Sequence, residues 1–345
     1  MKYKMRSYIP ILVLSLVAAC ALSCKKDEDS SSFKTFSGSL SFSIPEYVRY
    51  GDTFHLALSG VRRGDDDPDR IGYYYTETLL NARDTLRKEK DPADVLPEFD
   101  YTVAKDTIGT FSITCYAFAS GYSHCSASRT FYLVDPRLNE GSLTGVVFPE
   151  SAYSFTDSRD GRSYMAVDVD GTSWMAQNLA YPGDGSLGRP YAGCEVMNDV
   201  FGRFYTWEEA HDASTCPPGW HLPTDEDWVK LGAKFGSDPS VASPQTAPGA
   251  APALMGDASF NKERMWARPS VSINGKSGLL LLPAGYAVPS SSGWTQSGKG
   301  SFAVFWTAGE QDGMGIARYV SNEADGLFAG LYEKQDFAAP VRCVK

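Results

Sequence analysis

The chain has 345 residues, of which 43% are hydrophobic and 13% aromatic, and its formal net charge is −10. This length exceeds one typical domain and predicts two, and the apolar content is sufficient for each to bury a core. The acidic balance, without any cluster of lysines and arginines interleaved with aromatic residues, argues against binding of nucleic acid.

The N-terminus has the pattern of a signal segment. Three basic residues precede an apolar run over residues 9–19, which is too short to span a bilayer at about 20 residues. The run ends at two cysteines, in VAAC (17–20) and ALSC (21–24), and either stretch resembles a bacterial lipobox, in which the chain is cut before a cysteine that is then acylated.

Two cysteines compete for acylation. The residues before Cys20 match the box better, whereas KKDED after Cys24 resembles the export tag of Bacteroidetes surface lipoproteins. We favour Cys24, which makes residues 1–23 the signal peptide, residues 24–36 a flexible tether and the net charge of the remaining chain −13. Several acyl chains, at about 0.8 kcal/mol per buried methylene, give a lasting anchor. We therefore expect an outer-membrane lipoprotein that faces the cell surface.

Residues 37–136 read as short strands with period-two alternation, separated by glycine-containing turns. This pattern predicts an antiparallel sandwich, and it resembles the immunoglobulin-like or PKD-like domains of secreted bacterial proteins. Residues 78–98 fit it least well. Cys115 and Cys125 flank a turn, so either a disulfide or two unlinked thiols fits the sequence. The acidic run GDDDPD (64–69) lacks the alternation of a calcium loop and is interpreted as a solvated loop.

The second half has a different composition, because all seven tryptophans lie at or after Trp174. It contains, in order, SWMAQNLAY (173–181), FGRFYTWEEA (201–210), CPPGWHLPTDEDWVKL (216–231), LLLLPAGY (279–286) and VRCVK (341–345). These motifs resemble the Fibrobacter succinogenes major paralogous (FISUMP) domain, over residues 160–345, and residues 137–159 are then a linker. The Ala/Pro-rich stretch 243–254 departs from the family pattern and predicts a flexible loop.

The resemblance implies an exported, frequently lipidated protein with no reaction assigned to its class. It also implies an α+β fold similar to C-type lectins, although a fold does not fix a function. In that fold a disulfide between the helical region and the last strand corresponds to Cys216 and Cys343, and it contributes about 5 kcal/mol at most. Cys194 is left over, either free or competing for a partner.

Two helix starts are readable from the sequence. Thr206 and Glu209 form a capping box, which predicts a helix from Trp207 to about residue 212. Thr224 is a second N-cap, followed by three acids in the first turn, where the helix dipole favours negative charge. The acids of the motif at 216–231 therefore have a structural explanation.

Catalytic and cofactor chemistry is not favoured. His221 is expected to be buried and hydrogen-bonded to the backbone. The set Cys194, His211, Cys216 and His221 lacks the short Cys-x-x-Cys spacing of zinc sites. GDGSLG (183–188) matches a dinucleotide motif, but Arg189-Pro190 follows it where a helix would have to begin. A distant similarity to formylglycine-generating domains is weakened because their reactive cysteine pair has no counterpart. We expect no metal, no cofactor and no enzymatic activity.

Two functions remain. The first is a surface binding or adhesion module, with glycans as the candidate ligand, because sugars stack on aromatic faces. Trp266, beside the Ala/Pro-rich stretch, and Trp294, in a Ser/Gly-rich stretch, are the candidate ligand-binding residues. The calcium-dependent lectin triplets EPN and QPD are not present. The second is a structural or assembly component of an envelope or fimbrial protein complex, which would need an exposed apolar patch or edge strand.

Overall fold

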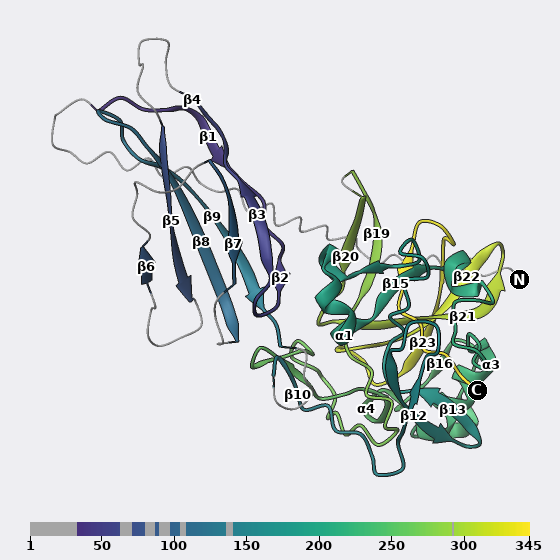
Figure 1. Cartoon of the computed structure of the whole chain (residues 1–345). Helices are drawn as coiled ribbons and strands as arrows, with labels where there is room; N and C mark the ends of the chain where they lie inside the picture. Colours follow the sequence, from purple (N-terminus) through teal and green to yellow (C-terminus); the bar gives the residue numbers. More distant parts are fainter. Residues whose placement is uncertain are drawn as a thin grey trace, which may run out of the picture.

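The computed structural model describes residues 33–62, 71–79, 87–89, 97–103, 108–135, 141–291 and 293–345. The fold is predominantly β, as predicted, and has two parts (Figure 1). The N-terminal part ends at residue 135 and the C-terminal part begins at residue 141. Within the described residues, no helix has both the length and the apolar composition that a bilayer crossing requires.

One larger sheet and two pairs of strands build the N-terminal part. The sheet has, in spatial order, β2 (Tyr47–Val48), β9 (Cys125–Leu133), β8 (Gly109–Phe118), β5 (Gly72–Leu79) and β6 (Arg87–Glu89). The pairs are β1 (Ser37–Ser41) with β4 (Ser59–Arg62), and β3 (Thr53–Ala57) with β7 (Glu98–Thr102). Leu56 of β3 and Ile113 of β8 belong to one buried cluster, so the pair β3–β7 packs against the larger sheet.

The period-two alternation predicted for this part is seen most regularly in β8, where every second residue is buried. The disulfide considered between Cys115 and Cys125 does not form. Both thiols are free and buried. The hairpin register pairs Cys115 with Ala127 and Cys125 with Ala117. Both thiols therefore face the core, but they are offset by two residue pairs along the ladder rather than opposite each other. Burial raises the pKa of Cys115 to about 12, which makes it an unreactive thiol.

Two larger sheets form the centre of the C-terminal part. One has the order β14 (Arg189–Pro190), β15 (Arg203–Thr206), β24 (Ala338–Ala339), β19 (Tyr286–Ser290) and β20 (Gly293–Ser297). The other has the order β16 (Thr246–Ala247), β23 (Leu327–Tyr332), β22 (Met314–Ser321) and β21 (Phe302–Gln311).

Smaller elements surround these sheets. The three-stranded sheets are β11 (Tyr153–Thr156), β12 (Ser163–Val169) and β13 (Thr172–Met175), and β10 (Leu143–Thr144), β17 (Ser259–Phe260) and β18 (Glu263–Arg264). The α-helices are α1 (Asn198–Phe201), α2 (Trp207–His211), α3 (Asp225–Phe235) and α4 (Ala251–Leu254). Short 3-10 helices cover Tyr191–Gly193, Glu195–Met197 and Pro239–Val241. Strands β10 and β11 lie in the segment predicted as a linker, 137–159, which is thus paired with the C-terminal part.

Helices α2 and α3 begin where the sequence predicts. The hydroxyl of Thr206 accepts a hydrogen bond from the Glu209 amide, and the Glu209 carboxylate accepts one from the Thr206 amide. Thr224 and Asp227 make the same reciprocal pair at the start of α3. Asp225 has a second role, because it accepts hydrogen bonds from Arg318 at 2.6 and 2.7 Å.

The predicted disulfide is confirmed. Cys216 and Cys343 are joined, with their Cα atoms 5.9 Å apart. The neighbouring Val344 exchanges backbone hydrogen bonds of 2.9 Å with His221. The C-terminal segment is therefore tied both covalently and through its backbone to the loop that precedes α3.

The stretch 243–254 is not a flexible loop, which corrects the prediction. It contains β16 and α4, and Ala250, Ala251 and Leu254 are fully buried. The reason is close packing, since a Cβ on Gly232 of α3 would lie only 2.6 Å from the Ala247 side chain. Alanine carries little hydrophobic signal, but here its small size allows α3 and β16 to approach closely.

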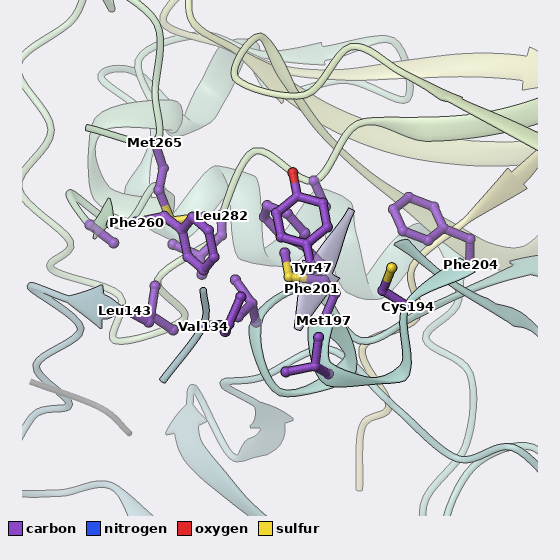
Figure 2. Close-up of a cluster of buried hydrophobic side chains, with 14 of the residues drawn as sticks. Tyr47, Val134, Leu143, Cys194, Met197, Phe201, Phe204, Phe260, Met265 and Leu282 are labelled. Atoms are coloured by element: carbon purple, nitrogen blue, oxygen red, sulfur yellow. The ribbon is translucent and has the colours of Figure 1, made fainter. Parts of the chain in front are cut away.

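The two parts of the molecule share a core. Tyr47 and Val134 of the N-terminal part pack into a cluster with Met197, Phe201 and Phe260 of the C-terminal part (Figure 2). The ring of Tyr47 stacks on Tyr132, with centroids 5.0 Å apart, and its edge meets Tyr191 and Phe260. The Lys299 ammonium donates a hydrogen bond of 3.0 Å to the Tyr47 hydroxyl. This buried apolar contact holds the two parts together.

Candidate functional site

A cavity of about 230 Å³ lies in the C-terminal part, close to the shared core. Its wall comes from β10, from β12 and the residue before it, from the segment after β13, from α1, and from residues near 280 and 342. Three polar side chains in this wall are almost fully buried, namely Arg342, Asn178 and Asn198. Burial of polar groups is costly unless they are paired, so their hydrogen bonds show what the cavity is suited to hold.

Arg342 is 2% exposed. Its Nε donates a hydrogen bond of 2.6 Å to Asn178 Oδ1, and its Nη1 donates to the carbonyls of Met175 and Leu279 at 3.1 and 2.8 Å. Asn178 is held in turn, because its Nδ2 donates to the Phe201 carbonyl at 2.8 Å. The Nη2 of Arg342 donates to no atom within the described part of the chain. The guanidinium is thus fixed on two sides, with one nitrogen left over.

Arg342 differs from the two other arginines that are buried among the residues the structure describes. Arg203 donates to both carboxylate oxygens of Glu195 at 3.0 and 2.8 Å, and Arg318 is paired with Asp225. Among the described residues, no carboxylate forms an ion pair with Arg342. Burial lowers the pKa of Arg342 to about 9, so at neutral pH it still carries its positive charge. The cavity therefore contains a buried cation that has no counter-ion in the described part of the chain.

Asn198 offers a hydrogen-bond acceptor to the cavity, where Arg342 offers a donor. Its Nδ2 donates a hydrogen bond of 2.6 Å to the Glu195 carboxylate, which orients the amide. Its Oδ1 is buried and accepts no hydrogen bond from any described residue. An unsatisfied buried acceptor costs about 1–3 kcal/mol. A ligand that donates a hydrogen bond here would recover that energy.

Both parts of the molecule contribute to the rim of the cavity. Asp199 accepts hydrogen bonds from Arg162 at 2.5 Å and from Arg49 at 2.7 Å, and Arg49 belongs to the N-terminal part. A wider hollow of about 500 Å³ shares Arg162, Asn198 and Asp199 with the cavity and includes Arg49. The cavity thus adjoins an open hollow at the junction of the two parts. Arg342 and Arg162 against Asp199 give its lining one excess positive charge, in a chain whose net charge is −10.

The sequence matches the family described as the Fibrobacter succinogenes major domain over residues 167–345, which is more than half of the chain. The chain belongs to this family. No curated protein matches it. The cavity lies largely within the matched Fibrobacter succinogenes major domain, while Leu143, Val146 and residues 162–164 of its wall precede the matched segment.

Solved structures add little. Superoxide reductase (neelaredoxin) from Ignicoccus hospitalis is 13% identical and has a TM-score of 0.21, over 28% of this chain and 82% of that one. A variant of the same reductase is 12% identical with a TM-score of 0.21, and another is 14% identical with a TM-score of 0.20. These values are too low to support an argument about the fold or the activity of the Fibrobacter succinogenes major domain.

Neither tryptophan predicted to bind a ligand lines this cavity. Trp266 is 1% exposed and packs in the core with Trp174 and Trp228, which corrects the expectation that it is accessible. The burial of the stretch 243–254 beside it is the reason. Trp294, on β20, is half-buried against the shared core, and the Arg189 guanidinium lies 4.2 Å from its ring centroid.

The residues considered for catalysis or metal binding have other partners or positions. The His221 side chain is exposed rather than buried, while its backbone is paired with Val344. His211 stacks on Trp207 with ring centroids 4.4 Å apart, and Cys216 is in the disulfide. Cys194 is free, and burial raises the pKa of its thiol. Residues 183–188 form turns that lead into β14 and not into a helix, as predicted.

Some predictions lie outside the described residues. These are the signal peptide, the acylated cysteine at Cys24 or Cys20, the first part of the tether and the acidic run 64–69. Within the described residues, no group of three or more His, Cys, Asp and Glu side chains is placed to hold a metal ion.

Sequence reasoning missed Arg342, Asn178 and Asn198. Two of them lie in motifs that carry the family resemblance, Asn178 in WMAQNLAY and Arg342 in VRCVK. Only Arg342 lies between two neighbours that both pack into the core, Val341 and Cys343. A buried polar residue is a stronger indication of a functional site than a buried apolar one.

Proposed function

We propose that the chain is a non-catalytic binding module of the cell surface, attached to the outer membrane by a lipid at Cys24, with a glycan as its ligand. The observation that carries the proposal is the polar wall of the cavity, where Arg342 offers a donor and Asn198 offers an acceptor, both without partners among the described residues. Pre-formed concave sites with a few convergent polar groups are typical of ligand-binding sites.

The proposal includes a finer account of the fold. The N-terminal part would be an immunoglobulin-like sandwich that carries the head, and the C-terminal part would be a C-type-lectin-like head. The second assignment is supported by the element order, with α2 and α3 before the long antiparallel strands β21 to β23, and by the disulfide from the helical region to the terminal segment.

A non-catalytic role is supported by the structural work of the reactive residue types in CPPGWHLPTDEDWVKL. Cys216 is cross-linked, Asp225 pairs with Arg318, and Asp227 caps α3. A nucleophile needs an oriented base beside it, and these side chains are already bound to partners that serve the fold.

The test is a glycan array combined with a pull-down from envelope extract, using the full-length protein in detergent. The isolated C-terminal part is unsuitable, because it would expose the cluster around Tyr47 and Val134. We expect retention of a defined set of glycans, loss of retention in Arg342→Met, and normal retention in Arg264→Met, an exposed arginine that does not line the cavity. Capture of a specific envelope protein, with no glycan retained, would reject the proposal in favour of the assembly role.

A further inference from the structure

We propose that the cavity at Arg342 is a site for an acidic sugar, with the sugar carboxylate on the Arg342 guanidinium and a sugar hydroxyl on Asn198 Oδ1. This inference rests on the proposed function and names the class of glycan. Arg342 Nη2 has no acceptor and Asn198 Oδ1 has no donor among the described residues, and both side chains line the same cavity. One ligand that carries both a carboxylate and hydroxyls satisfies both.

The charge of the wall selects for an anion. Arg203 and Arg318 show how this fold pairs buried arginines, in each case with a carboxylate at 3.0 Å or less. Arg342 is equally buried, and a ligand carboxylate would take the place of the missing acid. Hydrogen bonds between a guanidinium and a carboxylate are among the strongest in proteins, because both partners are charged.

The acceptor in the wall selects for hydroxyl groups. A simple anion such as acetate presents only acceptors to the cavity, and it would leave Asn198 Oδ1 unpaired. A site built to hydrogen-bond a hydroxyl discriminates strongly against analogues that lack one, because its buried polar group then stays unsatisfied. Asn198 is held in this orientation by Glu195, so its oxygen cannot turn away without losing that bond.

The size of the cavity limits the ligand to one sugar unit. Its volume of about 230 Å³ is below the roughly 300–1,000 Å³ of pockets that hold drug-sized molecules. The adjoining hollow at Arg162, Asp199 and Arg49 provides an open path for the rest of a chain. We therefore infer recognition of a single uronic acid or related acidic residue, at an end or branch of a polysaccharide.

The test is isothermal titration of the full-length protein in detergent with D-glucuronate, D-galacturonate, D-glucose, acetate and inorganic phosphate. At least one uronate is expected to bind about 10- to 100-fold more tightly than glucose, since a hydrogen bond to a charged group has that effect. Acetate and phosphate are expected to bind more weakly than the uronate. Arg342→Met should abolish the preference of the protein for acid over neutral sugar.

A second pair of variants keeps the test decisive if Arg342→Met does not fold. Ser163 lines the cavity and is exposed, so Ser163→Asp adds a negative charge at little cost in packing. It should weaken uronate binding about fivefold, the effect of about 1 kcal/mol between partly exposed charges. Ser154→Asp, exposed on the adjacent strand β11 and outside the cavity lining, should leave uronate binding unchanged.

Three results would overturn the inference. Equal binding of uronate and glucose would rule out a preference for acidic sugars, but it would leave the proposed glycan binding intact. Phosphate or acetate binding as tightly as the uronate would show a general anion site. If glycans are retained on an array but uronate binding is insensitive to Ser163→Asp, the sugar site lies elsewhere. If no glycan is retained, the proposed function is rejected as well.

Discussion

Removal of the disulfide is expected to destabilise the C-terminal part by a large fraction of its total stability. Cys216 and Cys343 are separated by 127 residues. In the chain-entropy treatment, opening a loop of this length costs about 5 kcal/mol, and measured losses are more often about 2–4 kcal/mol. The double variant Cys216→Ala and Cys343→Ala should therefore unfold at a lower urea concentration, with its free energy of unfolding reduced by about 2–5 kcal/mol.

Tryptophan fluorescence is the suitable signal, because all seven tryptophans lie at or after Trp174 and report only on the C-terminal part. A reductant should destabilise the natural chain by a similar amount and have no effect on the double variant, whose three free cysteines in the described residues serve as an internal control. A loss below about 1 kcal/mol, or a double variant that still responds to reductant, would refute the reasoning.

Four other outcomes are expected. Asp225→Asn should lower the free energy of unfolding by about 2–3 kcal/mol, because it leaves a buried arginine unpaired; Glu226→Gln, in the same helical turn, should cost less than about 1 kcal/mol, and equal losses would count against the ion pair. Tyr47→Ala should cost about 3–5 kcal/mol and split the calorimetric transition in two, and an unsplit, unshifted transition would contradict a shared core. Metabolic labelling with an alkyne fatty acid should fail in Cys24→Ser, whereas retained label would identify the other cysteine. Since burial lowers the pKa of Arg342 to about 9 and a bound carboxylate raises it, uronate affinity should fall above about pH 9, by up to about tenfold per pH unit in a titration series. Affinity that stays constant to pH 11 would contradict the lowered pKa of Arg342.

Local features of the fold could be predicted from the sequence, because the interactions that produce them are local. The capping boxes at Thr206 and Thr224 depend on residues three positions apart, and both helices begin there. The position of Cys115 relative to Cys125 depends on hairpin register, and a shift of two residues decides whether the thiols meet. Composition was a poor guide around Trp266, where alanines that predict a loop are packed in the core instead.

The candidate site could not be predicted, because it depends on which side chains surround Arg342 in the folded chain. Simple alternation in VRCVK would place Arg342 on the face opposite Cys343 and expose it to solvent. In the structure Val341, Arg342, Cys343 and Val344 are all buried, since both faces of this segment are covered. That no carboxylate of the described ranges pairs with Arg342 is a property of the assembled fold, and no spacing in the sequence encodes it.

The packing of Tyr47 against Tyr191 and Phe260 limits how such a protein can be rearranged by recombination. Modules joined by a bare hinge can be exchanged freely between genes, but exchange of the N-terminal part alone would remove Tyr47 from its contacts with the C-terminal part. A foreign module grafted in front of residue 141 would need an aromatic side chain at the position of Tyr47 and a cation at the position of Arg49. Without them, an apolar patch of the C-terminal part would be exposed and the entrance to the cavity would be altered.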